Sequence, residues 1–205
     1  MAYRINGVPT YALEGSIFVA GAAIQWLRDG LGIVQSSADT EAIARKRPHS
    51  RGVYMVPAFT GLGAPHWDAD ARGALLGLTR DSDVTDIVIA AIEAVCYQSR
   101  DLLEAMKADN CHPAELRIDG GMASNDVFIQ RLADITGLPA CRPRVTETTA
   151  LGAAFLAGLQ AGVYQDLQQI SELWQEDGRF TPAMPEPERE QYYQGWLRAL
   201  GRVKS

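Results

Sequence analysis

The feature that most constrains the fold is a strand, a glycine turn and a helix in direct succession between residues 116 and 135. The segment Leu116 to Asp119 predicts a strand that runs into Gly120 and Gly121. The helix that follows carries apolar residues at positions i, i+4 and i+7, namely Phe128, Leu132 and Ile135. We expect Ser124 to cap this helix. Such an order is typical of a layered α/β domain.

The same turn is a candidate ligand site. Glycines at the carboxyl end of a strand permit positive backbone angles and leave no side chain in the way of a ligand. The next helix N-terminus presents unpaired N–H groups to an anion. The residues Asp119 to Asn125 match neither the dinucleotide-binding pattern nor the P-loop. A plain strand-to-helix turn explains these residues about equally well.

Strands and helices also alternate elsewhere, which predicts a central mixed sheet flanked by helices. Val84 to Ala108 should form a long helix whose first half is buried, because it is apolar on nearly every side. A loop without periodicity, residues 58–72, is long enough to indicate a functional role or contact with another domain. The other expected strands are residues 11–18, 52–57, 73–78 and 138–142, and the other expected helices are 21–30, 38–47, 147–162, 166–174 and 186–203.

Composition excludes several classes of protein. Hydrophobic residues make up 47% of the 205-residue chain, charged residues 21%, and there are 19 glycines, so disorder, collagen and coiled coils are ruled out. The length suits one large domain or two small ones. A formal charge of -6 argues against a broad surface for nucleic acid or anionic membranes.

From the sequence given we expect no segment that directs the protein into or across a membrane. No apolar run reaches the roughly 18 residues that span a bilayer, and the polar start Met1 to Arg4 is unlike a signal peptide. The three cysteines, Cys96, Cys111 and Cys141, are widely spaced and form no Cys-x-x-Cys pair. We therefore expect a cytoplasmic protein with reduced thiols.

In two further segments, glycines suggest that a ligand or a neighbouring helix packs close to the backbone. Gly21 and Gln25 lie one turn apart on one face of a helix, where a bare glycine beside a long amide makes a notch that can accept an adenine or ribose edge. A close helix crossing at Gly21 with Gln25 exposed is the favoured alternative from these residues alone. Gly152 and Gly158 each cost about 1 kcal/mol relative to alanine inside a helix, so we expect a neighbouring helix or a ligand to pack against that backbone.

The residues give no complete catalytic constellation. His66, Asp68 and Asp70 are of the types that bind divalent ions, but their alternating spacing in a loop favours a tight turn with Trp67 packed against the domain. A nucleophile elbow, a His-Glu-x-x-His helix and an EF-hand loop are absent. We therefore predict no catalytic and no metal-binding residue.

Several segments together resemble the C-terminal half of the glycerol kinases, within the FGGY carbohydrate kinase family. Gly73 to Leu78, followed by Asp86, Ile87 and Ala90 to Glu93, is similar to the second signature of that family. The loop from Gly61 to Pro65 is more like the glycerol kinases than the sugar kinases, which tend to read Gly-Glu-Arg-Thr-Pro there. The remaining segments that carry the resemblance are Tyr11 to Gly15, Gly21 to Arg28, Pro57 to Trp67 and Asp119 to Gly121.

The resemblance implies an α/β fold of the actin-like ATPase (ribonuclease H-like) type, with residues 1–205 as a single C-terminal nucleotide-binding domain. Such kinases hold ATP, with Mg, in the cleft between two domains. By resemblance, Gly21 and Gln25 border the adenosine, and Gly121 and Asn125 help to hold the nucleotide. Asn125 is expected to open its helix with the side-chain amide facing the ligand.

The resemblance also implies what lies outside this sequence. The general base, the glycerol-binding residues and the phosphate loop all precede the segment that resembles Tyr11 to Gly15. Since Met1 and Ala2 pass directly into domain sequence, we expect a truncated or split product whose N-terminal kinase domain is absent.

The expected function is therefore the nucleotide-binding half of an ATP-dependent glycerol kinase, without turnover of its own. Its partners would be the N-terminal kinase domain and, in the complete enzyme, glycerol; a homo-oligomer is possible. The alternatives are the C-terminal half of another FGGY sugar kinase, or an assembly module that binds no nucleotide and has no activity.

Overall fold

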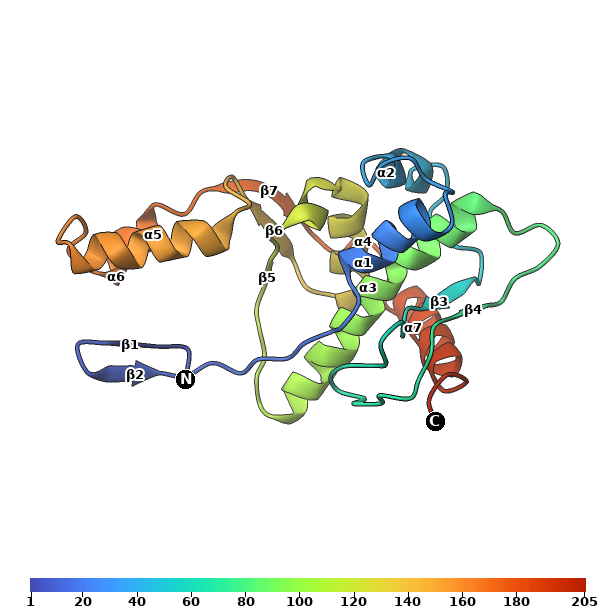
Figure 1. Cartoon of the computed structure of the whole chain (residues 1–205), viewed down its shortest axis with the longest axis horizontal. Coiled ribbons are helices and arrows are strands. Elements are labelled where there is room, and N and C mark those ends of the chain that lie inside the picture. Colours follow the sequence, from blue (N-terminus) through green and yellow to red (C-terminus); the bar gives the residue numbers. More distant parts are fainter.

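The long helix α3 (Val84–Ala108) forms the centre of the molecule in the computed structural model, which describes residues 1–205 (Figure 1). Its bounds and its buried first half confirm the sequence prediction. Asp83 caps the helix, because its side chain accepts hydrogen bonds from the backbone N–H groups of Thr85 and Asp86. In turn, the Asp86 carboxylate accepts a hydrogen bond from the Asp83 backbone N–H. This reciprocal arrangement is a capping box, so local sequence fixes where α3 begins.

The chain forms six further α-helices and two short irregular helical segments, and of these α5 and α6 project away from α3 (Figure 1). A π-helical turn at Trp26–Gly30 continues α1, and a 3-10 turn at Gly121–Ser124 precedes α4. The helices are α1 (Gly21–Gln25), α2 (Asp39–Ala44), α4 (Asp126–Thr136), α5 (Thr148–Gln160), α6 (Leu167–Glu172) and α7 (Glu186–Leu200). None of the helices has the length and hydrophobicity needed to cross a bilayer.

The strands confirm the α/β class, but they divide among three small sheets instead of joining one central sheet. The largest is mixed: β5 (Leu116–Arg117) pairs parallel with β6 (Ala140–Pro143), which pairs antiparallel with β7 (Glu176–Phe180). Two antiparallel pairs complete the set. They are β1 (Tyr3–Ile5) with β2 (Val8–Thr10), and β3 (Tyr54–Val56) with β4 (Ala74–Leu76).

One strand prediction was wrong, and three strands were missed. Residues 11–18 are irregular because most of their side chains face solvent and have no strand beside them. The hairpin of β1 and β2 was missed, although Asn6 and Gly7, both with positive φ (50° and 79°), are the residue pair that favours a two-residue turn. Strand β7 was missed because its polar sequence lacks apolar alternation, and it forms through pairing with β6.

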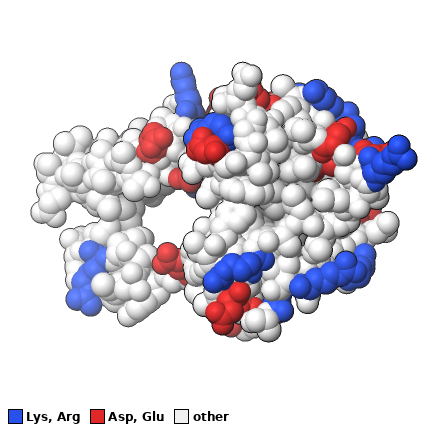
Figure 2. Space-filling model, turned by 45° about the vertical axis from the view of Figure 1, so that its right-hand side comes forward, with Lys and Arg blue, Asp and Glu red and all other residues white.

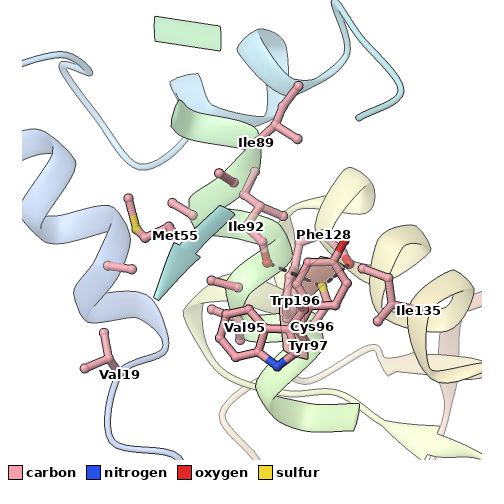
Figure 3. Packing of buried hydrophobic residues seen from close by; sticks show 14 of the residues in the cluster. Val19, Met55, Ile89, Ile92, Val95, Cys96, Tyr97, Phe128, Ile135 and Trp196 are labelled. Carbon is pink, nitrogen blue, oxygen red and sulfur yellow. Dashed lines mark hydrogen bonds between the residues drawn. The ribbon is translucent and has the colours of Figure 1, made fainter. Parts of the chain in front are cut away.

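The core joins α3 to α4, α7 and β3. A cluster of 31 buried hydrophobic residues fills this space (Figure 3). Tyr97 of α3 stacks on Trp196 of α7 with ring centroids 5.5 Å apart. Burying such aromatic pairs contributes about 0.5–1.5 kcal/mol beyond the area that they remove from water. The core therefore holds α7 against the middle of α3.

A buried carboxylate attaches the 58–72 loop to this core. Asp101 of α3 accepts hydrogen bonds from the Tyr193 hydroxyl (2.6 Å) and the Trp196 indole N–H (2.8 Å). Its Oδ2 lies 3.1 Å from His66 Nε2 in the loop. The prediction that Trp67 packs against the domain was wrong, since it is 68% exposed. His66, not Trp67, is the residue that anchors the loop.

An ionic cluster holds the start of α3 against the segment after α2. Arg47 donates to Asp83 (2.6 Å) and to Asp86 (2.9 Å), and Arg51 donates to the same Asp86 carboxylate at 2.5 Å. The hydrogen bond from Arg51 lowers the pKa of Asp86 below its ordinary value of 3.8, and Arg47 does the same for the pKa of Asp83.

This cluster predicts a loss of stability in acid. A carboxylate whose folded pKa is depressed stabilises the fold above its unfolded pKa, near 3.8, and that contribution is lost as the pH falls toward the folded pKa. We expect the midpoint of urea unfolding to fall steeply below about pH 4. Asp86→Asn should be less stable at pH 7 and should lose less between pH 5 and pH 2. If the unfolding midpoints of the two proteins fell in parallel with pH, Asp86 would not be a source of the acid sensitivity.

Candidate nucleotide site

A cavity of about 830 Å³ lies where the glycine turn meets the N-terminal part of the chain. Small-molecule pockets typically occupy about 300–1,000 Å³, so its size suits a nucleotide. All four predicted site residues, Gly21, Gln25, Gly121 and Asn125, line this one cavity. They come from α1 and from the turn before α4, which are about 100 residues apart in the sequence.

Gly21 and Gln25 form the α1 side of the cavity. Gly21 begins the helix, and a Cβ added there would meet no atom within 4 Å. The exposed Gln25 follows one turn later. The alternative, a close helix crossing at Gly21, is therefore wrong. The opening beside Gly21 leaves the α1 backbone accessible from the cavity.

The glycine turn forms the opposite side. Gly120 has a φ of 77°, in the left-handed region that favours glycine, while Gly121 has an ordinary φ and begins the 3-10 turn. A Cβ at either position would meet no atom within 4 Å. Gly120 therefore makes the chain reversal, and Gly121 keeps the surface of the cavity open.

Asn125, not Ser124, caps helix α4. Its Oδ1 accepts the Phe128 N–H at 3.0 Å, whereas the Ser124 hydroxyl donates back to the Gly121 carbonyl at 2.9 Å. The 3-10 turn moves the start of α4 two residues beyond the predicted cap. The Asn125 Nδ2 donates to the Thr40 hydroxyl at 3.3 Å. Both ends of this amide thus have protein partners, so a ligand that contacts Asn125 shares or replaces the bond to Thr40.

The sequence did not indicate the third side of the cavity. Helix α2 and the residues before it contribute hydroxyl and carboxylate groups: Ser37, Thr40 and Glu41. They match no motif, and the sequence predicted only a helix over residues 38–47. Thr40 is in fact buried and donates to the Ser37 carbonyl at 2.6 Å. This side offers polar partners to a ribose or a base edge.

The floor of the cavity is apolar and belongs to the main core. Ile92 and Val95 of α3 and Phe128 and Leu132 of α4 line it. Figure 3 shows how the first three of these side chains lie among the core residues. A flat ring system entering the cavity would therefore rest on hydrocarbon, while its polar edges meet α1, α2 and the turn.

Charges at the rim come mainly from the end of β5. Arg117 and Asp119 line the cavity, and Arg117 also lies over the Trp174 ring, 4.5 Å from its centroid. The Asp119 carboxylate accepts the Thr148 hydroxyl at the start of α5. No group of three or more His, Cys, Asp or Glu side chains is arranged to hold a metal ion. The cavity therefore combines an apolar floor with polar and charged groups along its sides.

Comparisons with known proteins identify the family to which the chain belongs. Residues 3–161 match the model of the FGGY family of carbohydrate kinases, C-terminal domain. The glycerol kinase of Alcanivorax borkumensis is 59% identical over 204 residues, which is 99% of this chain but 41% of the relative. The chain therefore spans about two fifths of the length of that relative.

Solved structures extend the likeness to the fold. A crystal structure of Plasmodium falciparum glycerol kinase with ADP matches 91% of this chain and 37% of its own, at 31% identity and a TM-score of 0.83. A ligand-bound xylulose kinase from Lactobacillus acidophilus matches 92% of this chain and 38% of its own, at 27% identity and a TM-score of 0.77.

Proposed function

The chain belongs to the FGGY family of carbohydrate kinases, and from that premise we propose that it is the nucleotide-binding half of a glycerol kinase. In this proposal residues 1–205 act as a single C-terminal domain. Its partner is an N-terminal kinase domain that binds glycerol, and the two work together in the cytoplasm. The reaction is transfer of the terminal phosphoryl group of ATP to glycerol.

One observation carries the proposal: Gly21, Gln25, Gly121 and Asn125 line a single cavity. Two of them leave open backbone, and the other two supply side-chain amides. The adenosine would lie against Gly21 and Gln25, over the apolar floor, and the phosphates would extend past Gly121 toward the free N–H groups of the turn. The ADP named for the Plasmodium falciparum relative supports a nucleotide as the ligand.

The residues fit ATP better than they fit magnesium. Bound ATP would supply the phosphoryl group, and this chain would orient it and exclude water from one side. No carboxylate cluster of the chain suits the metal, so we assign Mg no ligand here. The base that takes the glycerol proton is also assigned to the partner domain. The chain alone is therefore expected to bind nucleotide without turnover.

Calorimetric titration of the purified chain with ADP tests the binding. We expect saturable binding that is weaker than in a complete kinase, because pockets normally enclose most of their ligand. A coupled assay for glycerol 3-phosphate should show no formation by the chain alone. The absence of any saturable signal with ADP or ATP would refute the assignment of this cavity as a nucleotide site. Clear formation of glycerol 3-phosphate by the chain alone would refute the proposal that the partner domain supplies the base and the glycerol site.

Gln25→Ala should weaken ADP binding by less than about tenfold, since it removes at most one neutral hydrogen bond. Gln25 is exposed and at the helix end, so its replacement should leave the unfolding midpoint unchanged. Titration of the two proteins side by side measures the difference. Equal affinities would remove Gln25 from the site.

A further inference from the structure

The side-chain amide of Asn125 is held in one orientation at the wall of the nucleotide cavity. Its Oδ1 accepts the Phe128 N–H at 3.0 Å, and its Nδ2 donates to the Thr40 hydroxyl at 3.3 Å. A backbone N–H needs an acceptor, so the Phe128 contact by itself identifies the oxygen of the amide. The nitrogen of the amide is therefore on the side of Thr40.

The Thr40 hydroxyl independently requires the same orientation. Its single hydrogen is donated to the Ser37 carbonyl at 2.6 Å, and Thr40 is only 2% exposed. Because that hydrogen is already used, the hydroxyl oxygen can only accept a bond from Asn125. Two separate contacts thus agree on which end of the amide is nitrogen, and turning the amide over would break both of them.

This orientation leaves one hydrogen of Asn125 for a ligand. Nδ2 carries two hydrogens, and Thr40 accepts one of them. The protein provides no second acceptor for Nδ2, and Asn125 lines the cavity. The cavity is therefore offered a neutral N–H donor, which suits an acceptor atom of a nucleotide such as a ring nitrogen or a ribose oxygen.

Thr40 is itself fixed by the turn that begins α2. The Ser36 N–H donates to the Asp39 carboxylate at 2.8 Å, and the Asp39 N–H donates to the Ser36 hydroxyl at 3.3 Å. The backbone N–H of Thr40 donates to the same Ser37 carbonyl as its hydroxyl does. Local hydrogen bonds therefore hold the Thr40 oxygen in place before any ligand binds.

The overall charge of the chain does not attract a nucleotide. The formal net charge is -6, and on the face that Figure 2 shows, basic and acidic side chains are interspersed among uncharged ones. A net negative protein gives an anionic ligand no long-range attraction. Binding then depends on short-range donors of fixed direction, such as the Asn125 N–H.

We propose that Thr40 is a positioning residue for nucleotide binding, an inference that rests on the proposed function. Thr40 does not touch the nucleotide. It holds the Asn125 amide so that the second Nδ2 hydrogen faces an acceptor of the ligand. An amide that is ordered in advance loses less conformational freedom when the ligand binds.

Calorimetric titration with ADP compares two variants with the parent chain. Thr40→Val lacks the hydroxyl and should weaken ADP binding by about threefold to tenfold, the range of one neutral hydrogen bond. Thr40→Ser keeps the hydroxyl and should bind ADP like the parent. Unchanged affinity in Thr40→Val would overturn the proposal. Tighter binding would also overturn it, because the ligand would then replace the Thr40 bond instead of sharing the amide.

Thr136→Val is the matched control for stability. Thr136 is also buried and donates to a backbone carbonyl, that of Leu132, at 2.6 Å, but it does not line the cavity. Its urea unfolding midpoint should fall about as much as that of Thr40→Val, while its affinity for ADP should stay that of the parent. Equal loss of affinity in both valine variants would assign the effect to stability and overturn the proposal.

A double variant tests whether Thr40 acts through Asn125. Asn125→Ser keeps a residue favoured as a helix cap but removes the amide. Adding Thr40→Val to Asn125→Ser should then cause no further loss of ADP affinity, because the two changes remove the same contact. Losses that simply add would mean that Thr40 contacts the nucleotide itself, which contradicts a positioning role.

These results also separate the inference from the proposed function. If the parent chain and Thr40→Val bind ADP equally well, the role of Thr40 is wrong and the nucleotide site stands. If the parent chain binds no ADP, the proposed function fails, and the role of Thr40 fails with it. Nuclear magnetic resonance of the ligand-free chain checks the contact directly: the Asn125 side-chain amide signals should shift in Thr40→Val and stay in place in Thr136→Val.

Discussion

Arg131→Met should lower the free energy of unfolding by about 3–5 kcal/mol, because it leaves a buried carboxylate without its charged partner. Arg131 of α4 donates to Glu93 Oε1 of α3 at 2.6 Å, and both side chains are more than 90% buried. The guanidinium also donates to the carbonyls of Pro48 and Arg47, which lose their partners in the variant. Urea unfolding at neutral pH measures the loss.

The matched control removes both charges. Arg131→Met combined with Glu93→Leu should recover a good part of the loss, because a buried ion pair is often replaced by hydrocarbon at little net cost. Ser50 would still lose its bond to Glu93 Oε2 (2.8 Å), so recovery should be incomplete. A double variant as unstable as the single one would show that the pair acts through packing instead of charge.

Gly121→Val should abolish measurable ADP binding by the chain while leaving its stability nearly unchanged. The added Cβ meets no protein atom and Gly121 has an ordinary φ, so the side chain has room in the folded chain. It would then occupy the surface past which the phosphates are proposed to extend. Calorimetric titration and urea unfolding of the same preparation measure both effects.

Gly152→Val is the matched control, since a Cβ there also meets nothing and the residue lies outside the cavity. It should bind ADP like the parent chain. Equal loss of affinity and stability in Gly121→Val would mean that Gly121 serves the fold and not the ligand. Unchanged affinity would place the phosphates elsewhere.

The sequence alone predicted the bounds of a helix where its local preferences agree with its packing in the fold. Helix α3 has apolar periodicity and a capping residue, and its bounds are those predicted. The start of α4 was misplaced because Ser124 and Asn125 are both good caps, and only the 3-10 turn, which depends on three-dimensional packing, selects Asn125. The division of the strands into three small sheets was not foreseen, because pairing between distant strands is not encoded in either strand by itself.

The candidate site also has features that could be predicted from the sequence and features that could not. Spacing alone favoured a helix crossing at Gly21 and left the Gly121 turn ambiguous, and the family resemblance was what related the two. The shared cavity is a tertiary fact about segments far apart in sequence. Thr40 and its neighbours were not predicted as part of the site, because a threonine in a polar helix matches no binding motif. Its place beside Asn125 is evident only from the folded structure.

The Asp101 contacts bear on how freely the 58–72 loop can move. The Asp101 carboxylate on α3 makes hydrogen bonds with the 58–72 loop and with the last helix, α7. These contacts hold the loop, α3 and α7 together. These hydrogen bonds restrain motion of the loop relative to α3 and α7. The loop itself is held in place and is poorly suited to serve as a flap.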